Sequence, residues 1–249
     1  MQFNEHATND DIVSDVKWWL TGSYAGTIDF HINDITRSAN RELDDVVSLI
    51  LRSDSRWQFD DSNFTTLPIG TADLMPDQQD YELSGAEFLS VSEVSVLNVD
   101  GDWVVLKPLD RNKGKAQRLI DLEATSGMPE FYDKIGNSIM LYPLPSASDV
   151  VTGTDTGGIR VVVERPGSYF IPTDTTKAPG FAPTFHRIIS LGIAMDYCVV
   201  HGLHNKLVTL ENKKNQMKME MVEHYTRRSK DEQPRLGLKE EDYGASSLI

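Results

Sequence analysis

The chain has 249 residues, of which 39% are hydrophobic and 25% are charged, and its formal net charge is −14. This length and balance are typical of a globular protein with one large domain or two small ones. No segment approaches the roughly 18 consecutive apolar residues of a membrane span, and the start, MQFNEHATNDD, has no apolar signal core. We therefore expect a soluble protein that is made in the cytoplasm.

The acidic residues are concentrated in the N-terminal half of the chain. Residues 1–110 contain 21 Asp or Glu and 6 Lys or Arg, whereas residues 111–249 contain 17 and 18. Because a sequence-specific reader of nucleic acid normally presents a basic face, this balance argues against that class of protein. Two interpretations of the acidity stay open: it keeps the protein soluble, or it forms a wall past which DNA slides.

Two helices are predicted near the N-terminus. Asn9 is a suitable N-cap, and apolar residues follow at helical spacing as far as Gly22. After the turn TGSYAG, a longer amphipathic helix is predicted from one apolar stripe: Ile28, Ile32, Ile35, Ala39, Leu43, Val46 and Ile50. The other face of this helix is charged and is either solvated or in contact with a neighbouring subunit: Asp34, Arg37, Arg41, Asp44, Asp45 and Arg52.

From Arg56 to Arg165 the apolar pattern changes toward a period of two. This pattern predicts a β domain of about six to eight strands. Two turns predict hairpins, one at Asp100–Gly101 and one at Gly136–Asn137. The insertion RNKGKAQRLIDLEATSG favours a short helix, and the stretch ASDVVTGTDTGG predicts an exposed loop.

Helical periodicity returns after FIPTDTTKAPGFAP. A helix is predicted to begin at Pro183 or Thr184, with one apolar face: Phe185, Ile188, Ile189, Gly192, Met195 and Cys198. The segment HGLHN predicts a break. A second helix to about Arg228 is predicted from another stripe: Leu203, Leu207, Leu210, Lys214, Met217, Met221 and His224. The last twenty or so residues have no periodicity, so we expect a tail that is disordered unless bound.

Motifs for chemistry are weak, so the sequence predicts no enzyme, no cofactor and no metal site. His201 and His204 lack an acidic partner at metal-binding spacing, and we interpret them as part of a helix junction. TGTDTGG lacks the Lys and the Ser or Thr of a phosphate-binding loop. Cys198 is expected to be a buried thiol that packs as a small apolar side chain.

Two further groups of residues have competing interpretations. Aspartates that resemble cation ligands are interpreted as turn formers, because they lack the glycine and glutamate of a calcium loop: Asp60, Asp61, Asp77 and Asp80. Aromatic residues of the β region either line a sugar site or, as we favour, fill the core: Trp57, Phe59, Trp103, Phe131, Tyr132 and Tyr142.

Several motifs follow one another in a distinctive order. The run LPIGTADLMPDQQDYELSGAEFLSVSEVSV precedes the hairpin VDGDWVVLKPLD, and IRVVVERPG precedes FAPTFHRIISLGIAMDYCVVHG. Between them stands a series of glycine, proline and aromatic positions: Gly127, Pro129, Phe131, Tyr132, Gly136, Asn137, Tyr142, Pro143 and Pro145. From about Ile28 to Arg228 the chain resembles the head-to-tail connector (adaptor) proteins of tailed double-stranded DNA phages, of the tail tubular protein A type.

The resemblance implies an α+β fold in which helices from both ends of the chain form a helical bundle. An antiparallel β domain, either a sandwich or barrel-like, is inserted between them. We expect N-terminal helices in residues 1–55, the β domain in 56–170, C-terminal helices in 171–228 and an extended tail in 229–249.

The resemblance also implies a structural virion protein at the head–tail interface that is not an enzyme. Such subunits form a dodecameric ring between the portal protein and a downstream tail, nozzle or terminator protein. DNA passes through the central channel, and no membrane is involved. A ring contact uses two different faces of each subunit. An alternative function is a non-catalytic carbohydrate- or receptor-binding β module of a phage tail.

Two sets of site residues follow from the resemblance. The C-terminal tail is expected to dock on the portal, and the alternative is that it is an inert disordered segment. Docking would use sparse apolar anchors: Leu236, Leu238, Tyr243, Leu248 and Ile249. An acidic channel lining, past which DNA slides because phosphate contacts are few, is expected on the long helix or on loops near Asp60 and Asp77. The helix candidates are Asp34, Glu42, Asp44 and Asp45.

Overall fold

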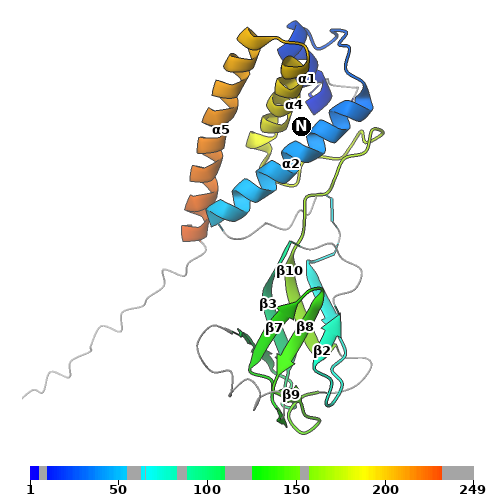
Figure 1. Cartoon of the computed structure of the whole chain (residues 1–249), viewed down its shortest axis with the longest axis vertical. Helices are drawn as coiled ribbons and strands as arrows, with labels where there is room; N and C mark the ends of the chain where they lie inside the picture. Colours follow the sequence, from blue (N-terminus) through cyan, green and yellow to red (C-terminus); the bar gives the residue numbers. More distant parts are fainter. Residues whose placement is uncertain are drawn as a thin grey trace, which may run out of the picture.

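A computed structural model describes residues 1–5, 10–54, 63–64, 66–82, 89–109, 125–151 and 157–231, with the backbone alone for 54 and 227–231. The fold is mixed α+β, as predicted. Helices from both ends of the chain lie together at one end of the molecule, and the strands lie at the other (Figure 1). No sheet of the described strands closes into a barrel, so the barrel-like alternative is wrong.

The first helix, α1, spans Ile12–Thr21, and its cap differs from the prediction. Asp11 is the N-cap, because its side chain accepts a hydrogen bond of 2.8 Å from the backbone N–H of Ser14. Asn9, the predicted cap, lies outside the described residues. The end of the helix is as expected, since Gly22 adopts the left-handed conformation with φ of 80°.

The long helix α2 spans Ile32–Asp54, and both of its predicted faces are confirmed. Its apolar side is buried in the helical core: Ile35, Ala39, Leu43, Val46, Val47 and Ile50. Ile28 precedes the helix and is half-buried against the same core. The six charged residues predicted for the other face are all exposed.

Two C-terminal helices complete the helical part of the molecule. After a 3₁₀ turn at Pro183–Phe185, α4 spans Arg187–Val200 and contacts α1, α2 and α5. Gly202, with φ of 67°, lies in the turn that ends α4, where HGLHN predicted a helix break. Helix α5 then spans His204–Asp231.

The stripe predicted for α5 is confirmed along its middle and wrong at its ends. Leu210, Lys214 and Met221 are buried, but Leu203 is 37% exposed. His224 is exposed and Tyr225 is buried in its place. Because an α-helix has 3.6 residues per turn, Tyr225, four residues after Met221, stays on the buried face, whereas His224, three residues after it, does not.

The β region contains two four-stranded sheets. The first sheet is ordered β1 (Ile69–Ala72), β10 (Ile159–Glu164), β3 (Ser90–Leu97) and β4 (Trp103–Val105). The second is ordered β2 (Asp80–Glu82), β8 (Ser138–Tyr142), β7 (Phe131–Ile135) and β5 (Lys107–Pro108). A third, small sheet pairs β6 (Ser126–Gly127) with β9 (Leu144–Pro145).

The described strands number ten rather than six to eight, because three of them have only two residues. Both predicted hairpins are confirmed: Leu97 pairs with Trp103 around Gly101, and Ile135 pairs with Ser138 around Gly136. Pairing is antiparallel except for the short β5–β7 and β6–β9 contacts. The predicted insertion helix lies outside the described residues.

Side chains from both four-stranded sheets share one buried cluster. Tyr81, Ile139 and Leu141 come from the second sheet. Val94, Val96, Ile159 and Val161 come from the first. This cluster is separate from the helical core, so each end of the molecule has a core of its own.

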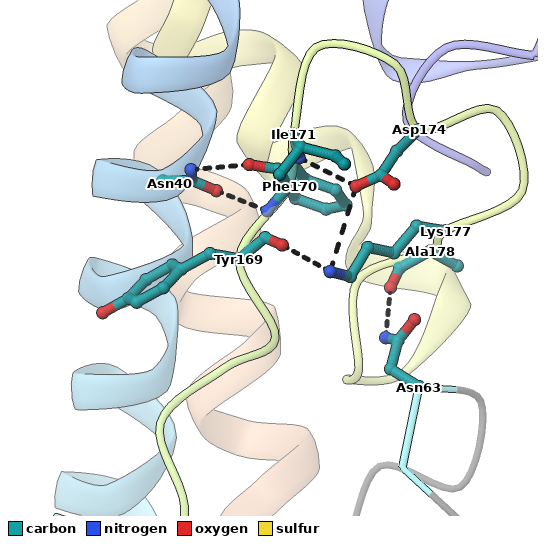
Figure 2. A network of polar contacts seen from close by, with 8 residues as sticks. All are labelled: Asn40, Asn63, Tyr169, Phe170, Ile171, Asp174, Lys177 and Ala178. Carbon is teal, nitrogen blue, oxygen red and sulfur yellow. Dashed lines mark hydrogen bonds and ion pairs between the residues drawn. The ribbon is translucent and has the colours of Figure 1, made fainter. Parts of the chain in front are cut away.

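The chain returns from β10 to the helices through an extended segment that is fastened to α2 (Figure 2). The Asn40 side chain donates to the Phe170 carbonyl at 3.0 Å and accepts from the Phe170 N–H at 2.8 Å. The neighbouring backbone groups are bonded by Asp174, which accepts from the Ile171 N–H at 2.8 Å, and by Lys177, which donates to the Tyr169 carbonyl. Side chains thus replace the backbone partners that an extended segment lacks outside a sheet.

The other connection between the two ends is also tied down. Asn63 donates to the Ala178 carbonyl at 2.7 Å. Arg165, just after β10, donates to the carbonyls of Thr66 at 2.7 Å and Leu67 at 2.6 Å. Side-chain hydrogen bonds therefore hold both of the segments that connect the helical end to the β end of the molecule. Across the described part of the chain, no helix has the length and apolar character needed to cross a membrane.

Candidate subunit interface

An open depression of about 460 Å³ lies between the N-terminal half of α2 and the C-terminal end of α4. Helical periodicity brings Asp34, Arg37 and Arg41 of α2 to this surface, because they stand three and four residues apart. The end of α4 supplies Val199 and Val200, which are 63% and 80% exposed. We call this surface the α2–α4 depression.

The walls of the α2–α4 depression combine both charge signs with apolar and aromatic side chains. Ser38 donates a hydrogen bond to the Asp196 carboxylate, which joins α2 to α4 at the floor of this region. The rings of Tyr197 and His201 stack with centroids 4.0 Å apart. Exposed apolar groups beside fixed charges are typical of surfaces that contact another protein.

The four acidic residues predicted on α2 fall into two environments. Asp34, Asp44 and Asp45 are exposed, and Asp34 lies in the α2–α4 depression. Asp44 accepts a hydrogen bond of 2.9 Å from the Tyr169 hydroxyl. Glu42 is 8% exposed and turned into the helical core, so it does not belong to the solvent-facing acidic surface.

Glu42 forms an ion pair inside the helical core. Its Oε2 lies 2.5 Å from Nζ of Lys214 on α5. Gly192 of α4 provides the space, because a Cβ there would lie 2.0 Å from Cδ of Glu42. Burial raises the pKa of Glu42 above its ordinary value of 4.5, while Lys214 acts in the opposite direction. The pair therefore joins α2, α4 and α5 at one point.

A second buried carboxylate, Asp15 of α1, was not identified from the sequence. Its Oδ2 accepts hydrogen bonds from the Ser190 hydroxyl at 2.5 Å and from the Trp19 indole at 2.9 Å. Arg187 lies 3.6 Å from the same oxygen. The available signal was an aspartate within the apolar face of a short helix, four residues before a tryptophan. Asp15 thereby connects α1 to α4.

Comparison with known proteins adds no family to this geometry. No protein-family model matches the chain. The curated proteins also contain no match.

The residues considered for metal or thiol chemistry lie in the helical core or at a helix junction. Cys198 is fully buried, as predicted, and burial raises the pKa of its thiol. His201 and His204 flank the break between α4 and α5, as expected for a helix junction. Within the described ranges, no three His, Cys, Asp or Glu side chains gather as ligands for a metal ion.

The aspartates and aromatics of the β region are confirmed only in part. Asp77 lies in a turn, with φ of 60°, whereas Asp80 begins β2 and is not a turn former. Tyr142 is buried as predicted for the core, but Trp103 is 39% exposed beneath Arg160. Phe131 and Tyr132 are half-buried. Several other candidates lie outside the described residues: Trp57, Phe59, Asp60 and Asp61.

Helix α5 presents a second apolar surface to solvent. Val208, Met219 and Val222 are 58%, 67% and 36% exposed, on the side away from the buried stripe. Sequence reasoning identified only the buried stripe, because its apolar residues are more numerous. The tail residues predicted to dock on the portal lie outside the described residues: Leu236, Leu238, Tyr243, Leu248 and Ile249.

Proposed function

We propose that the chain is the subunit of a phage head-to-tail connector, which assembles into a dodecameric ring between the portal and the tail. The observation that carries the proposal is the closure of one helical core by segments from both ends of the chain. The strands of residues 69–164 lie between those segments in sequence and build a core of their own. This order is what the resemblance to connector proteins implies.

In this proposal the helices form the bundle of the connector, and the two four-stranded sheets form its β-sandwich. The shared cluster of Tyr81, Val94, Ile139 and Val161 supports a sandwich, because each sheet contributes side chains to the same interior. The bundle is the part suited to contacts between copies, since it carries the α2–α4 depression and the exposed apolar residues of α5.

The ring surrounds a channel through which DNA passes during packaging and ejection. Asp44 and Asp45 are exposed on α2 outside the α2–α4 depression and supply acidic groups to the channel wall, whereas Asp34, Arg37 and Arg41 line the depression. A wall of this charge forms few phosphate contacts, so DNA slides past it instead of binding. The apolar residues of the C-terminal tail dock on the portal and gain order on binding. The protein has no catalytic role in this proposal.

Electron microscopy of the purified full chain, alone and mixed with the portal protein of the same phage, tests the proposal. Rings with a central hole, alone or on the portal, are the expected result. Monomers that ignore the portal under all conditions would reject it and favour a receptor-binding β module. Binding to a glycan array would then be the next measurement.

A further inference from the structure

We propose that α5 of one copy docks into the α2–α4 depression of the next copy, through an outward-facing row of residues that sequence analysis did not identify. This row, the outer stripe, consists of Val208, Asn212, Asn215, Met219 and Val222. The inference rests on the proposed function, since it specifies which two faces meet in the ring.

The outer stripe follows the spacing of a helix-packing surface. Its members are separated by four, three, four and three residues, which keeps them on one face of an α-helix. The alternation of three and four residues is also the a/d spacing at which a helix packs against other helices. All five side chains are exposed, and they lie apart from the buried row that includes Leu210, Lys214 and Met221.

Charge distinguishes the outer stripe from the rest of the exposed surface of α5. No member of the stripe is acidic or basic, whereas charged residues flank it, with Glu211 and Lys218 on one side and Glu220 and Glu223 on the other. An outward face that met only water would be expected to carry these charges at its centre. An apolar and amide centre with a charged rim is typical of a surface that is covered by protein.

The α2–α4 depression has complementary properties. It is concave, and the exposed Val199 and Val200 offer apolar contacts to the valines and methionine of the outer stripe. Its walls carry carboxylates as well as the guanidinium groups of Arg37 and Arg41. The amides of Asn212 and Asn215 both donate and accept hydrogen bonds, so they can pair with either charge.

The positions of the two surfaces favour a second copy as the occupant. Figure 1 shows α5 and the beginning of α2 on opposite sides of the helical end of the molecule, with α4 between them. A closed ring needs two different, complementary faces on each subunit. The outer stripe of α5 and the α2–α4 depression are two different surfaces of the same helical unit, as this requirement demands.

Three variants of the full chain test the inference. The stripe variant carries Val208→Arg and Met219→Arg, and the depression variant carries Val200→Arg. The control is Thr209→Arg, at an exposed α5 position beside Val208 but outside the stripe. All replaced side chains are exposed, so circular dichroism and thermal melting should match the wild type. Self-association is measured by analytical ultracentrifugation over a concentration series, and ring formation with the portal by electron microscopy.

The expected result is a loss of self-association, by about tenfold or more in the dissociation constant, for the stripe and depression variants but not for the control. Mixing the two defective variants should yield a one-to-one heterodimer. The stripe variant keeps an intact depression and the depression variant keeps an intact stripe, so one contact can form. This heterodimer cannot grow into a ring.

Other outcomes overturn the inference in distinguishable ways. If the depression variant associates as well as the wild type does, the stripe binds some other surface. If the wild type forms rings and neither variant weakens them, the contact lies elsewhere and the connector function stands. If the wild type forms no assembly alone or on the portal, both the inference and the proposed function are rejected.

Discussion

Glu42 on α2 and Lys214 on α5 form an ion pair of 2.5 Å within the helical core, although the two residues are 172 positions apart in the chain. Both residues are less than a tenth exposed. Removing two charges from water is costly, so a single unpaired partner is much worse than the pair. The pair therefore joins α5 to α2 within the helical core.

Breaking the pair on one side should destabilise the protein strongly. We expect Lys214→Ala to lower the free energy of unfolding by about 3–5 kcal/mol, because Glu42 is left buried without its partner. Urea denaturation followed by circular dichroism measures the loss. Replacing both residues, as in Glu42→Leu with Lys214→Met, should cost less than the single change. Asp45→Ala on the exposed face of α2 is the control, and a similar loss there would contradict the explanation.

The pH dependence of stability should reveal the raised pKa of Glu42. The folded state holds the Glu42 proton more tightly than the unfolded state, whose pKa is near the ordinary 4.5. The stability from this group is therefore fully present below about pH 4.5 and is lost as pH rises through the folded-state pKa. Glu42→Gln removes this titration. Between pH 4 and pH 7, the unfolding free energy of the wild type should therefore fall relative to that of Glu42→Gln. A constant difference would show that the pKa is not raised.

Gly192→Ala should disturb the same junction from α4. A Cβ at this position would lie 2.0 Å from Cδ of Glu42, so the carboxylate must move away from its place beside Lys214. We expect a loss of about 1–3 kcal/mol in unfolding free energy. In a Glu42→Ala background the same change should cost clearly less, because the clashing group is absent. A double-mutant cycle by chemical denaturation gives the coupling, and additive losses would contradict a direct contact.

Asn40 should contribute to stability through the segment that returns from the β region. Asn40→Ala removes two hydrogen bonds and leaves the N–H and carbonyl of Phe170 without those partners. The expected loss is about 1–3 kcal/mol. Tyr169→Phe, which removes the hydrogen bond to the exposed Asp44, is the matched control and should change stability by about 0.5 kcal/mol or less. Thermal and urea unfolding compare the two, and equal losses would show that the Asn40 bonds carry no special weight.

The N-cap of α1 is Asp11, whereas the sequence predicted Asn9, and mutation of each residue can distinguish the two. Asp11→Ala should cost about 1 kcal/mol, because the Ser14 N–H loses its acceptor at the helix N-terminus. Asn9→Ala should cost less, since Asp11 already provides the cap. Chemical denaturation of both variants measures the difference. A larger loss for Asn9→Ala would support the cap that the sequence alone suggested.

Local patterns in the sequence were sufficient to predict most of the described elements. The apolar period of α2 located its buried face, and the turns at Gly101 and Gly136 located two hairpins, because these features depend on residues close together in the chain. The cap of α1 was misplaced because Asn9 and Asp11 have similar propensities. Only the hydrogen bond to Ser14 distinguishes them.

The environments of charged residues were decided by tertiary structure. Asp44 and Glu42 are two residues apart on one helix, yet one is exposed and the other is buried. Glu42 stands beside Leu43 at the margin of the apolar face, and its burial depends on Lys214 and on the space left by Gly192. Those contacts come from helices that lie far along the chain, so no local pattern contains them.

The sequence by itself determined the α+β class, the approximate positions of the main helices and which stripe of each helix is most apolar, because hydrophobic periodicity is a property of neighbouring residues. Tertiary structure alone decided that Asp15 and Glu42 are paired in the core, and that Val199, Val200 and the outer stripe of α5 stay exposed. Burial is a property of what packs against a side chain, and the packing partners are brought together only when both ends of the chain close one helical core.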